Sequence, residues 1–327
     1  MSQADADFAR GNDLLQSFVR GDAMIGLIAD VPAAERQMLE AFWAAARGGS
    51  AEAFRALGDC YLATLRSLGA FDGVDASHAA DHEWSAEAAA IEEDSNEELQ
   101  AALRCYFEAG RLGDRDGTLQ FARVSRHSSW DNQEIALKAL KALPNPTPAE
   151  TYQTGLVHHW VAELEEALAC HLRAAEAGDG DAQFELSLFY AQGLGTDADE
   201  EKAREWLERA AEGGHPRALY NVGAAWASGS RGEPDMDRAA EYYDRAAAAG
   251  NGRAAAMIAV MILTEELVGT REQAVKRLEQ ADALGFPTWE LLDAAGVDDP
   301  REDSDDSDED DEDSDSDDEE DSDSDDE

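Results

Sequence analysis

The second half of the sequence repeats itself every 36 residues. The blocks Arg173–Gly178, Arg209–Gly214 and Arg245–Gly250 each open on Arg-Ala-Ala, and their closing glycines lie 36 residues apart. A looser fourth copy ends at Gly285. Self-similarity at a fixed period of 20 to 50 residues is typical of stacked supersecondary units. We therefore expect a repeat protein, and this expectation governs how every local motif is interpreted.

A second pattern begins four residues after each glycine. A small residue is followed at offsets of 4, 5 and 8 by an apolar residue, a small residue and an aromatic or apolar residue. These offsets share one face of a helix, so we expect that face to be buried. The three sets are Ala182, Leu186, Ser187 and Tyr190; Ala218, Val222, Gly223 and Trp226; and Ala254, Ile258, Ala259 and Ile262.

A second helix follows within each unit, marked by Ala203, Trp206 and Ala210 in one copy. The next copy has Ala239, Tyr242 and Ala246 at the same positions. Each unit is thus expected to be a helical hairpin whose apolar face is covered by its neighbours, with six or seven hairpins in all. In looser copies, Cys105 and Cys170 occupy the position of Trp206, which predicts buried thiols.

Departures from the period divide the chain. We expect residues 1–147 to form irregular N-terminal helical repeats, with an insertion at about 67–95. Residues 148–297 should form the regular repeats and a short capping helix, because a proline cluster at 144–148 cannot continue a helix. Residues 298–327 consist almost wholly of Asp, Glu and Ser, so we expect a disordered acidic tail.

Charge and composition exclude several classes of function. The chain has 26 basic and 73 acidic residues, a net charge of −47, and such a surface repels a phosphate backbone. We therefore expect no nucleic-acid binding. No stretch reaches the roughly 20 apolar residues of a membrane helix, and the N-terminus lacks a secretory signal, so we expect no membrane contact and a cytoplasmic location. Three widely spaced cysteines predict neither a disulfide framework nor a zinc ribbon.

The run from Ala182 to Gly214, with its echo from Ala218 to Gly250, resembles the Sel1-like repeat family, a relative of the tetratricopeptide helical solenoids. The resemblance implies an all-α fold, a right-handed α-solenoid of stacked helical hairpins. It also implies a non-catalytic adaptor or scaffold that binds a partner peptide or protein in its concave groove, without a cofactor or a metal.

The resemblance further implies that the first helix of each hairpin lines the groove. Positions five and two residues before and after the Leu186-type core residue then face it. Applied to successive units, this rule selects Arg123, Arg126, Tyr152, Phe184, Leu188, Arg217, Tyr220 and Arg253. Arginines among aromatics suit a peptide with acidic groups or a terminal carboxylate. The alternative is that these arginines pair with neighbouring Glu and Asp.

Other functions stay open at this point. His78 and His82 are four residues apart and, with nearby carboxylates, could ligate a transition metal in a metal-dependent catalytic protein. The acidic tail could shield basic partners as a chaperone or mimic, contact the protein's own groove, or serve only for solubility. The run Gly193–Ala198 matches a dinucleotide fingerprint, but a helix is expected before it where that fingerprint needs a strand.

Overall fold

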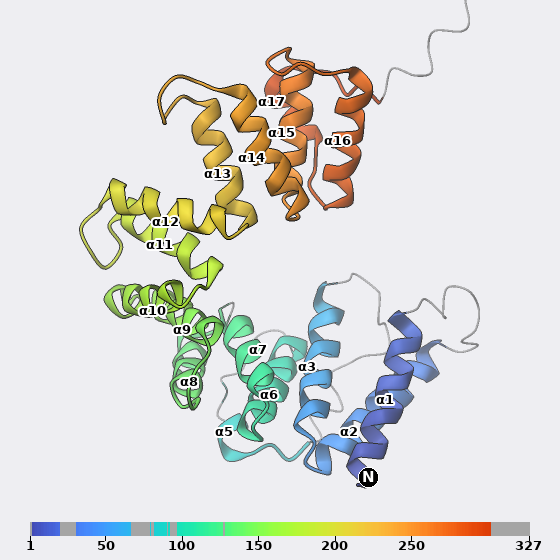
Figure 1. The fold of residues 1–327 in the computed structure, drawn as a ribbon. Coiled ribbons are helices and arrows are strands. Elements are labelled where there is room, and N and C mark those ends of the chain that lie inside the picture. Colours follow the sequence, from blue (N-terminus) through green and yellow to red (C-terminus); the bar gives the residue numbers. More distant parts are fainter. Residues whose placement is uncertain are drawn as a thin grey trace, which may run out of the picture. The chain divides into compact units, whose positions relative to one another are not determined.

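A computed structural model describes residues 2–19, 31–66, 79, 82–89, 91, 97–126 and 128–301 (Figure 1). All regular secondary structure within these ranges is α-helical. The chain divides into two compact units, Met1–Ala210 and Ala211–Glu327. This is a division by compactness. The predicted change in repeat regularity between residues 147 and 148 is a separate property and stays a prediction.

The helices of the first unit are α1 (Gln3–Val19), α2 (Val31–Arg47), α3 (Ala51–Arg66), α5 (Ala86–Ala89), α6 (Glu97–Arg111), α7 (Arg115–Ser125), α8 (Trp130–Lys141), α9 (Pro148–Trp160), α10 (Leu164–Glu176), α11 (Gly180–Gln192) and α12 (Glu200–Glu212), whose last two residues belong to the second unit. The second unit continues with α13 (Pro216–Ala227), α14 (Met236–Ala248), α15 (Gly252–Leu263), α16 (Arg271–Ala283) and α17 (Trp289–Ala295).

Successive helices pack in pairs, as the repeat pattern predicts. In the first unit α1 packs on α2, α3 on α6, α7 on α8 and α9 on α10. In the second unit α13 packs on α14 and α15 on α16, and α17 also packs on α15. Within each unit, contacts also join neighbouring hairpins, for example α6 to α7 in the first and α14 to α15 in the second. The described chain is therefore an all-helical array of stacked hairpins, and the right-handed sense of the solenoid stays a prediction.

One turn recurs between hairpins, and Gly178 shows how it works. Gly178 has a φ of 93°, a left-handed conformation that other residues adopt at a cost. The amides of Gly178 and Asp179 donate to the carbonyls of Ala175 and Ala174, each at 3.0 Å, and so close α10. The Asp179 carboxylate then accepts from the amide of Ala182 at 2.8 Å and caps α11. Two adjacent residues thus end one hairpin and start the next.

The same turn at Gly250 and Asn251 also ties one repeat to the previous one. The amide of Asn251 donates to the carbonyl of Ala246, and its side-chain oxygen accepts from the amide of Ala254. Its side-chain amide donates to the carbonyl of Pro216, at the start of the preceding first helix, at 3.2 Å. The capping residue therefore also holds the first helices of neighbouring hairpins together.

The predicted apolar stripes face the core. The first two members of each first-helix set are at most 3% exposed, and the aromatic or aliphatic residue at the end of each set is half-buried. The small residue in the middle allows close packing: a Cβ built on Gly223 would lie 2.9 Å from the ring of Tyr243. Cys105 and Cys170 are buried as predicted, and so is Cys60.

One ring position differs from the prediction. In α14 the buried ring is Tyr243, at 1% exposure, whereas the predicted Tyr242 is half-buried. The room left by Gly223 on α13 admits the ring of Tyr243. Most of the predicted insertion at about 67–95 and all of residues 302–327 lie outside the described residues, and the predictions for those segments remain as stated.

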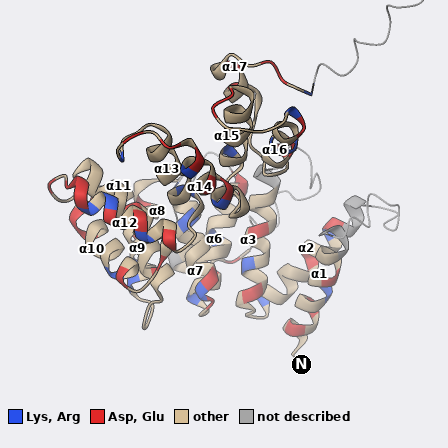
Figure 2. Cartoon of the chain, turned by 45° about the horizontal axis from the view of Figure 1, so that its top comes forward, with Lys and Arg blue, Asp and Glu red and all other residues tan. Residues whose placement is uncertain are grey.

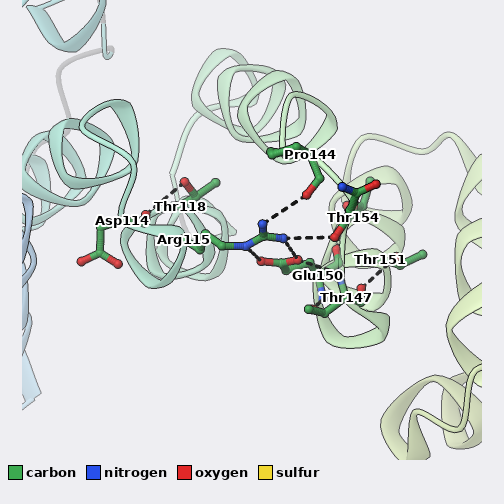
Figure 3. Close-up of polar contacts among 9 residues, drawn as sticks. Asp114, Arg115, Thr118, Pro144, Thr147, Glu150, Thr151 and Thr154 are labelled. Carbon is green, nitrogen blue, oxygen red and sulfur yellow. Dashed lines mark hydrogen bonds and ion pairs between the residues drawn. The ribbon is translucent and has the colours of Figure 1, made fainter.

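An ion pair spans the proline cluster between α8 and α9. Arg115, the first residue of α7, donates from Nε to Glu150 in α9 at 2.7 Å and from Nη1 to the carbonyl of Pro144 at 3.1 Å (Figure 3). Glu150 also accepts from the amide of Thr147 in a capping box that starts α9. The bond from Arg115 lowers the pKa of Glu150 to about 2. This contact joins α7 to α9 across a connection that lacks the glycine turn.

We predict that Gly178→Ala destabilises the first unit by roughly 1–2 kcal/mol, the cost of a left-handed alanine. A Cβ at position 178 would meet no atom within 4 Å, so the cost is conformational and not steric. Gly180→Ala is the matched control, because its Cβ is equally free and its φ is not left-handed. The control should leave stability unchanged or raise it by up to about 1 kcal/mol. Urea unfolding followed by circular dichroism measures both, and equal effects would contradict the assignment.

Candidate partner-binding surface

The eight predicted groove residues belong to first helices or their ends, and we describe them unit by unit. The first unit holds Arg123, Arg126, Tyr152, Phe184 and Leu188, on α7, α9 and α11. The second unit holds Arg217, Tyr220 and Arg253, on α13 and α15. All four arginines are exposed, and Tyr152, Leu188 and Tyr220 are half-buried. Phe184 is only 2% exposed, so its ring supports the core beneath this surface.

In the first unit, Arg126 lies over an aromatic ring of the next hairpin. Its guanidinium carbon is 5.6 Å from the centroid of the Trp160 ring, where α9 ends. A guanidinium within about 6 Å of a ring centroid is attracted by the electrons of the ring face. Trp160 was not among the residues selected from the sequence. The contact pairs an arginine at the end of one first helix with an aromatic residue at the end of the next.

The second unit also contains an arginine–aromatic pair between first helices, here near the starts of the two helices. The guanidinium carbon of Arg253 on α15 lies 5.3 Å from the centroid of the Tyr220 ring on α13. The Tyr220 ring in turn stacks at 5.3 Å on Tyr243, whose burial raises the pKa of its hydroxyl to about 12. Tyr220 is therefore held between a buried ring and an exposed cation.

Three of the four arginines of this surface have no charge partner among the described residues. Figure 2 shows Lys and Arg as short patches among many Asp and Glu residues. Arg115 and Arg277 form ion pairs with Glu150 and Asp244. Arg123, Arg126 and Arg253, by contrast, form no ion pair with any residue that the structure describes. Their positive charges are therefore available to a carboxylate from outside the described chain.

A buried histidine supports the half-buried ring of Tyr152. His171 on α10 is fully buried, and its ring lies 5.5 Å from that of Tyr152 and 5.0 Å from that of Phe189. Neither ring nitrogen has a hydrogen-bond partner among the described residues. Burial lowers the pKa of His171 to about 4, so the ring is neutral near pH 7.

The residues considered for metal binding have different surroundings. His78 lies outside the described residues. His82 packs against the rings of Trp43, Phe54 and Trp84, with centroids 4.7–5.6 Å away, and burial lowers its pKa. The part of the chain that the structure describes contains no group of three His, Cys, Asp or Glu side chains arranged to hold a metal ion.

Two further sequence features can now be placed. The run from Gly193 to Ala198 forms the turn after α11, and a helix precedes it where a dinucleotide site has a strand. Gly193 ends α11 in the left-handed conformation. Among the described residues, no helix combines the length and the apolar character needed to cross a bilayer.

These features define a protein built from tandem helical hairpins with short turns. A family model for the Sel1 repeat matches residues 152–179, 180–215 and 216–251. The chain therefore contains three consecutive Sel1 repeats, as the resemblance in the sequence predicted. Proteins with this repeat commonly serve as scaffolds for protein interactions.

Solved structures include several similar chains. A Sel1 repeat protein from Oxalobacter formigenes is 22% identical over 89% of both chains, with a TM-score of 0.49. A protective antigen from uropathogenic Escherichia coli is 18% identical over 90% of this chain and 65% of that one, with a TM-score of 0.40. Immunity protein PA5088 from Pseudomonas aeruginosa is 17% identical over 72% of this chain and 92% of that one, with a TM-score of 0.39. No match was found among curated proteins. At these scores the similarities assign no function to the chain.

We predict that His171 makes the first unit less stable in acid. Its pKa is about 4 in the folded chain and about 6.5 when unfolded, so only the unfolded state takes up a proton as the pH falls from 6.5 toward 4. At pH 5 this should cost the native protein about 2 kcal/mol relative to pH 7. His171→Leu removes the titrating group. Between pH 7 and pH 5, the unfolding free energy of this variant should therefore rise by about 2 kcal/mol relative to that of the unmodified chain. Urea unfolding at both pH values tests this, and a pH-independent difference would contradict it.

Proposed function

We propose that this protein is a non-catalytic adaptor that binds partner proteins through the exposed faces of its first helices. The observation that carries the proposal is the pair of stacked contacts, Arg126 on Trp160 and Arg253 on Tyr220. Each combines an arginine without a carboxylate partner among the described residues and an aromatic ring from a neighbouring hairpin. Arginine and aromatic side chains are the types most enriched at sites that dominate binding energy.

The chemistry of these pairs favours an acidic peptide as the bound segment. A guanidinium presents a planar set of donors that matches a carboxylate, and a stacked ring holds that plane in place. The half-buried ring of Tyr220 offers rigid apolar area beside Arg253, and the half-buried ring of Tyr152 adds apolar area on α9. The bound segment would therefore carry Asp, Glu or a terminal carboxylate next to an apolar side chain.

The net charge of −47 does not prevent such binding at physiological salt. Exposed charges are largely screened beyond about 8 Å at 0.15 M ionic strength. A carboxylate in contact with Arg253 therefore interacts mainly with that arginine and its immediate neighbours. Because added salt screens the distant carboxylates, association with an acidic peptide should also become faster as the salt concentration rises from low values.

The cysteines support a role without covalent chemistry. All three are buried, and burial raises the pKa of the Cys60 thiol to about 12 and that of the Cys105 thiol well above its ordinary value. A thiol acts as a nucleophile in its ionised form, which these surroundings disfavour. Cys60, Cys105 and Cys170 lie on the buried faces of α3, α6 and α10, and these positions favour a role in packing.

Charge reversal on the proposed surface tests this function. The full chain, immobilised, should capture partner proteins from a lysate of its source organism, identified by quantitative mass spectrometry. Arg126→Glu tests the first unit and Arg253→Glu the second. We expect at least one of them to reduce capture of specific partners by tenfold or more, because a carboxylate would then face a carboxylate. Calorimetry with the most depleted partner, purified, should show the same loss of affinity.

Arg204→Glu provides the matched control. Arg204 is exposed, lies on the second helix α12 and forms no ion pair with a described residue, so the change in charge is identical. Capture by this variant should equal that of the unmodified chain. Equal capture by all three variants and the unmodified chain would show that the first-helix faces do not bind the partner.

A further inference from the structure

A pocket of about 690 Å³ opens between α6, α7 and α8 in the first unit. It lies among the irregular repeats and shares no residue with the proposed partner-binding surface. Its volume is within the 300–1,000 Å³ range of small-molecule sites. The lining residues are Phe107, Gly110, Arg111, Gly113, Asp114, Arg115, Thr118, Phe121, Ile135, Lys138, Ala139, Ala142, Leu143 and Pro144.

The pocket has apolar walls of defined shape. The rings of Phe107 and Phe121 meet edge to face with centroids 5.4 Å apart, and Phe121 is fully buried in the core of this unit. Ile135 and Leu143 pack against the same core and are only partly covered. Phe107, Ile135 and Leu143 present an apolar surface that solvent reaches and no described residue fills.

The ion pair described above fixes one side of the pocket opening. Arg115 is held by Glu150, which follows the proline cluster, and by the carbonyl of Pro144, the first proline of that cluster (Figure 3). Thr118, one turn further along α7, is buried and bonds to the carbonyl of Asp114. The walls formed by α7 and by the loop at Pro144 are therefore connected before any ligand binds.

One charge at the pocket remains without a partner. Arg111 pairs with Glu108, Arg115 with Glu150, and Asp114 with Arg55. Each of these charges is thus neutralised by a neighbour. Lys138 on α8 is exposed, and its side chain forms no hydrogen bond or ion pair with any residue of the described chain. A single uncompensated cation therefore stands beside an apolar cavity, in a chain dominated by negative charge.

We propose that this pocket binds a small organic anion with an aromatic or aliphatic body and one carboxylate. The apolar body occupies the space between Phe107, Ile135 and Leu143, and the carboxylate meets the ammonium group of Lys138. The size of the cavity and the sign of its one unpaired charge select this class of ligand. The site is independent of the proposed partner binding.

A pair of probes with the same body and opposite charge tests the proposal on the full chain. 4-Phenylbutyrate and 3-phenylpropylamine share a phenylpropyl body and differ only in the charged group, and calorimetry at 0.15 M salt measures both. The carboxylate should bind at least tenfold more tightly than the amine. Because the net negative charge of the chain attracts the amine, a preference for the carboxylate has to come from the pocket. Equal or tighter binding of the amine, or no binding of the carboxylate, would overturn the proposal.

Variants on α8 locate the binding site. Lys138→Glu should weaken binding of 4-phenylbutyrate at least tenfold. Lys141→Glu is the matched control, because Lys141 is exposed on the same helix and does not line the pocket. The affinity of this variant for 4-phenylbutyrate should stay within twofold of that of the unmodified chain. Ala139→Trp fills the cavity and should abolish binding while circular dichroism shows an intact fold. Unchanged binding in Ala139→Trp, or equal losses in Lys138→Glu and Lys141→Glu, would place the probe elsewhere and overturn the proposal.

Discussion

The turn made by a left-handed glycine and the capping residue after it determines how the hairpins connect. At Gly178 and Asp179, backbone amides close the helix before the turn and a side chain caps the helix after it. Gly113 with Asp114 and Gly250 with Asn251 form the same set of bonds. Because the two residues satisfy both helix ends, no loop intervenes and the direction of the next helix is fixed. The regular spacing of 36 residues follows from repeating this turn with helices of similar length.

Stacking also forms the proposed partner-binding surface. Fixed turns place the first helices of neighbouring hairpins side by side, so residues of one hairpin contact those of the next. Arg253 lies on Tyr220 for this reason, and Asn251 bonds to Pro216 beneath them. A hairpin alone would leave these side chains without their partners. The proposed recognition therefore depends on contacts between repeats and not on any one hairpin.

Much of the fold could be predicted from the sequence because its determinants are local. The buried stripes follow from helical periodicity, and the cap α17 follows from Pro287 and Gly296 on either side of it. The choice between Tyr242 and Tyr243 could not be predicted in this way. Adjacent side chains on a helix point in different directions around its axis. Only the space above Gly223 in the structure shows which of the two rings enters the core. The burial of Phe184 depends likewise on how α11 is rotated against its neighbours.

The site was less predictable because its contacts join residues distant in sequence. Arg126 and Trp160 are 34 residues apart, and the rule that selected Tyr152 from α9 does not select Trp160, which ends that helix. The bond from Arg115 to Glu150 spans a proline cluster that carries no repeat signal. The pocket beside Lys138 arises where that irregular connection replaces the glycine turn. Sequence periodicity thus predicts the regular contacts, and the irregular ones require the structure.

Hydrogen exchange at the amides of Asp114, Asp179 and Asn251 tests the central role of the turn most directly. Each of these amides donates to a carbonyl of the preceding helix, at 2.9–3.0 Å. The account predicts that they exchange as slowly as amides within the adjoining helices, such as that of Leu186 in α11. Exchange at the rate of an unstructured peptide would show that the hairpins are joined by open loops and would contradict the account.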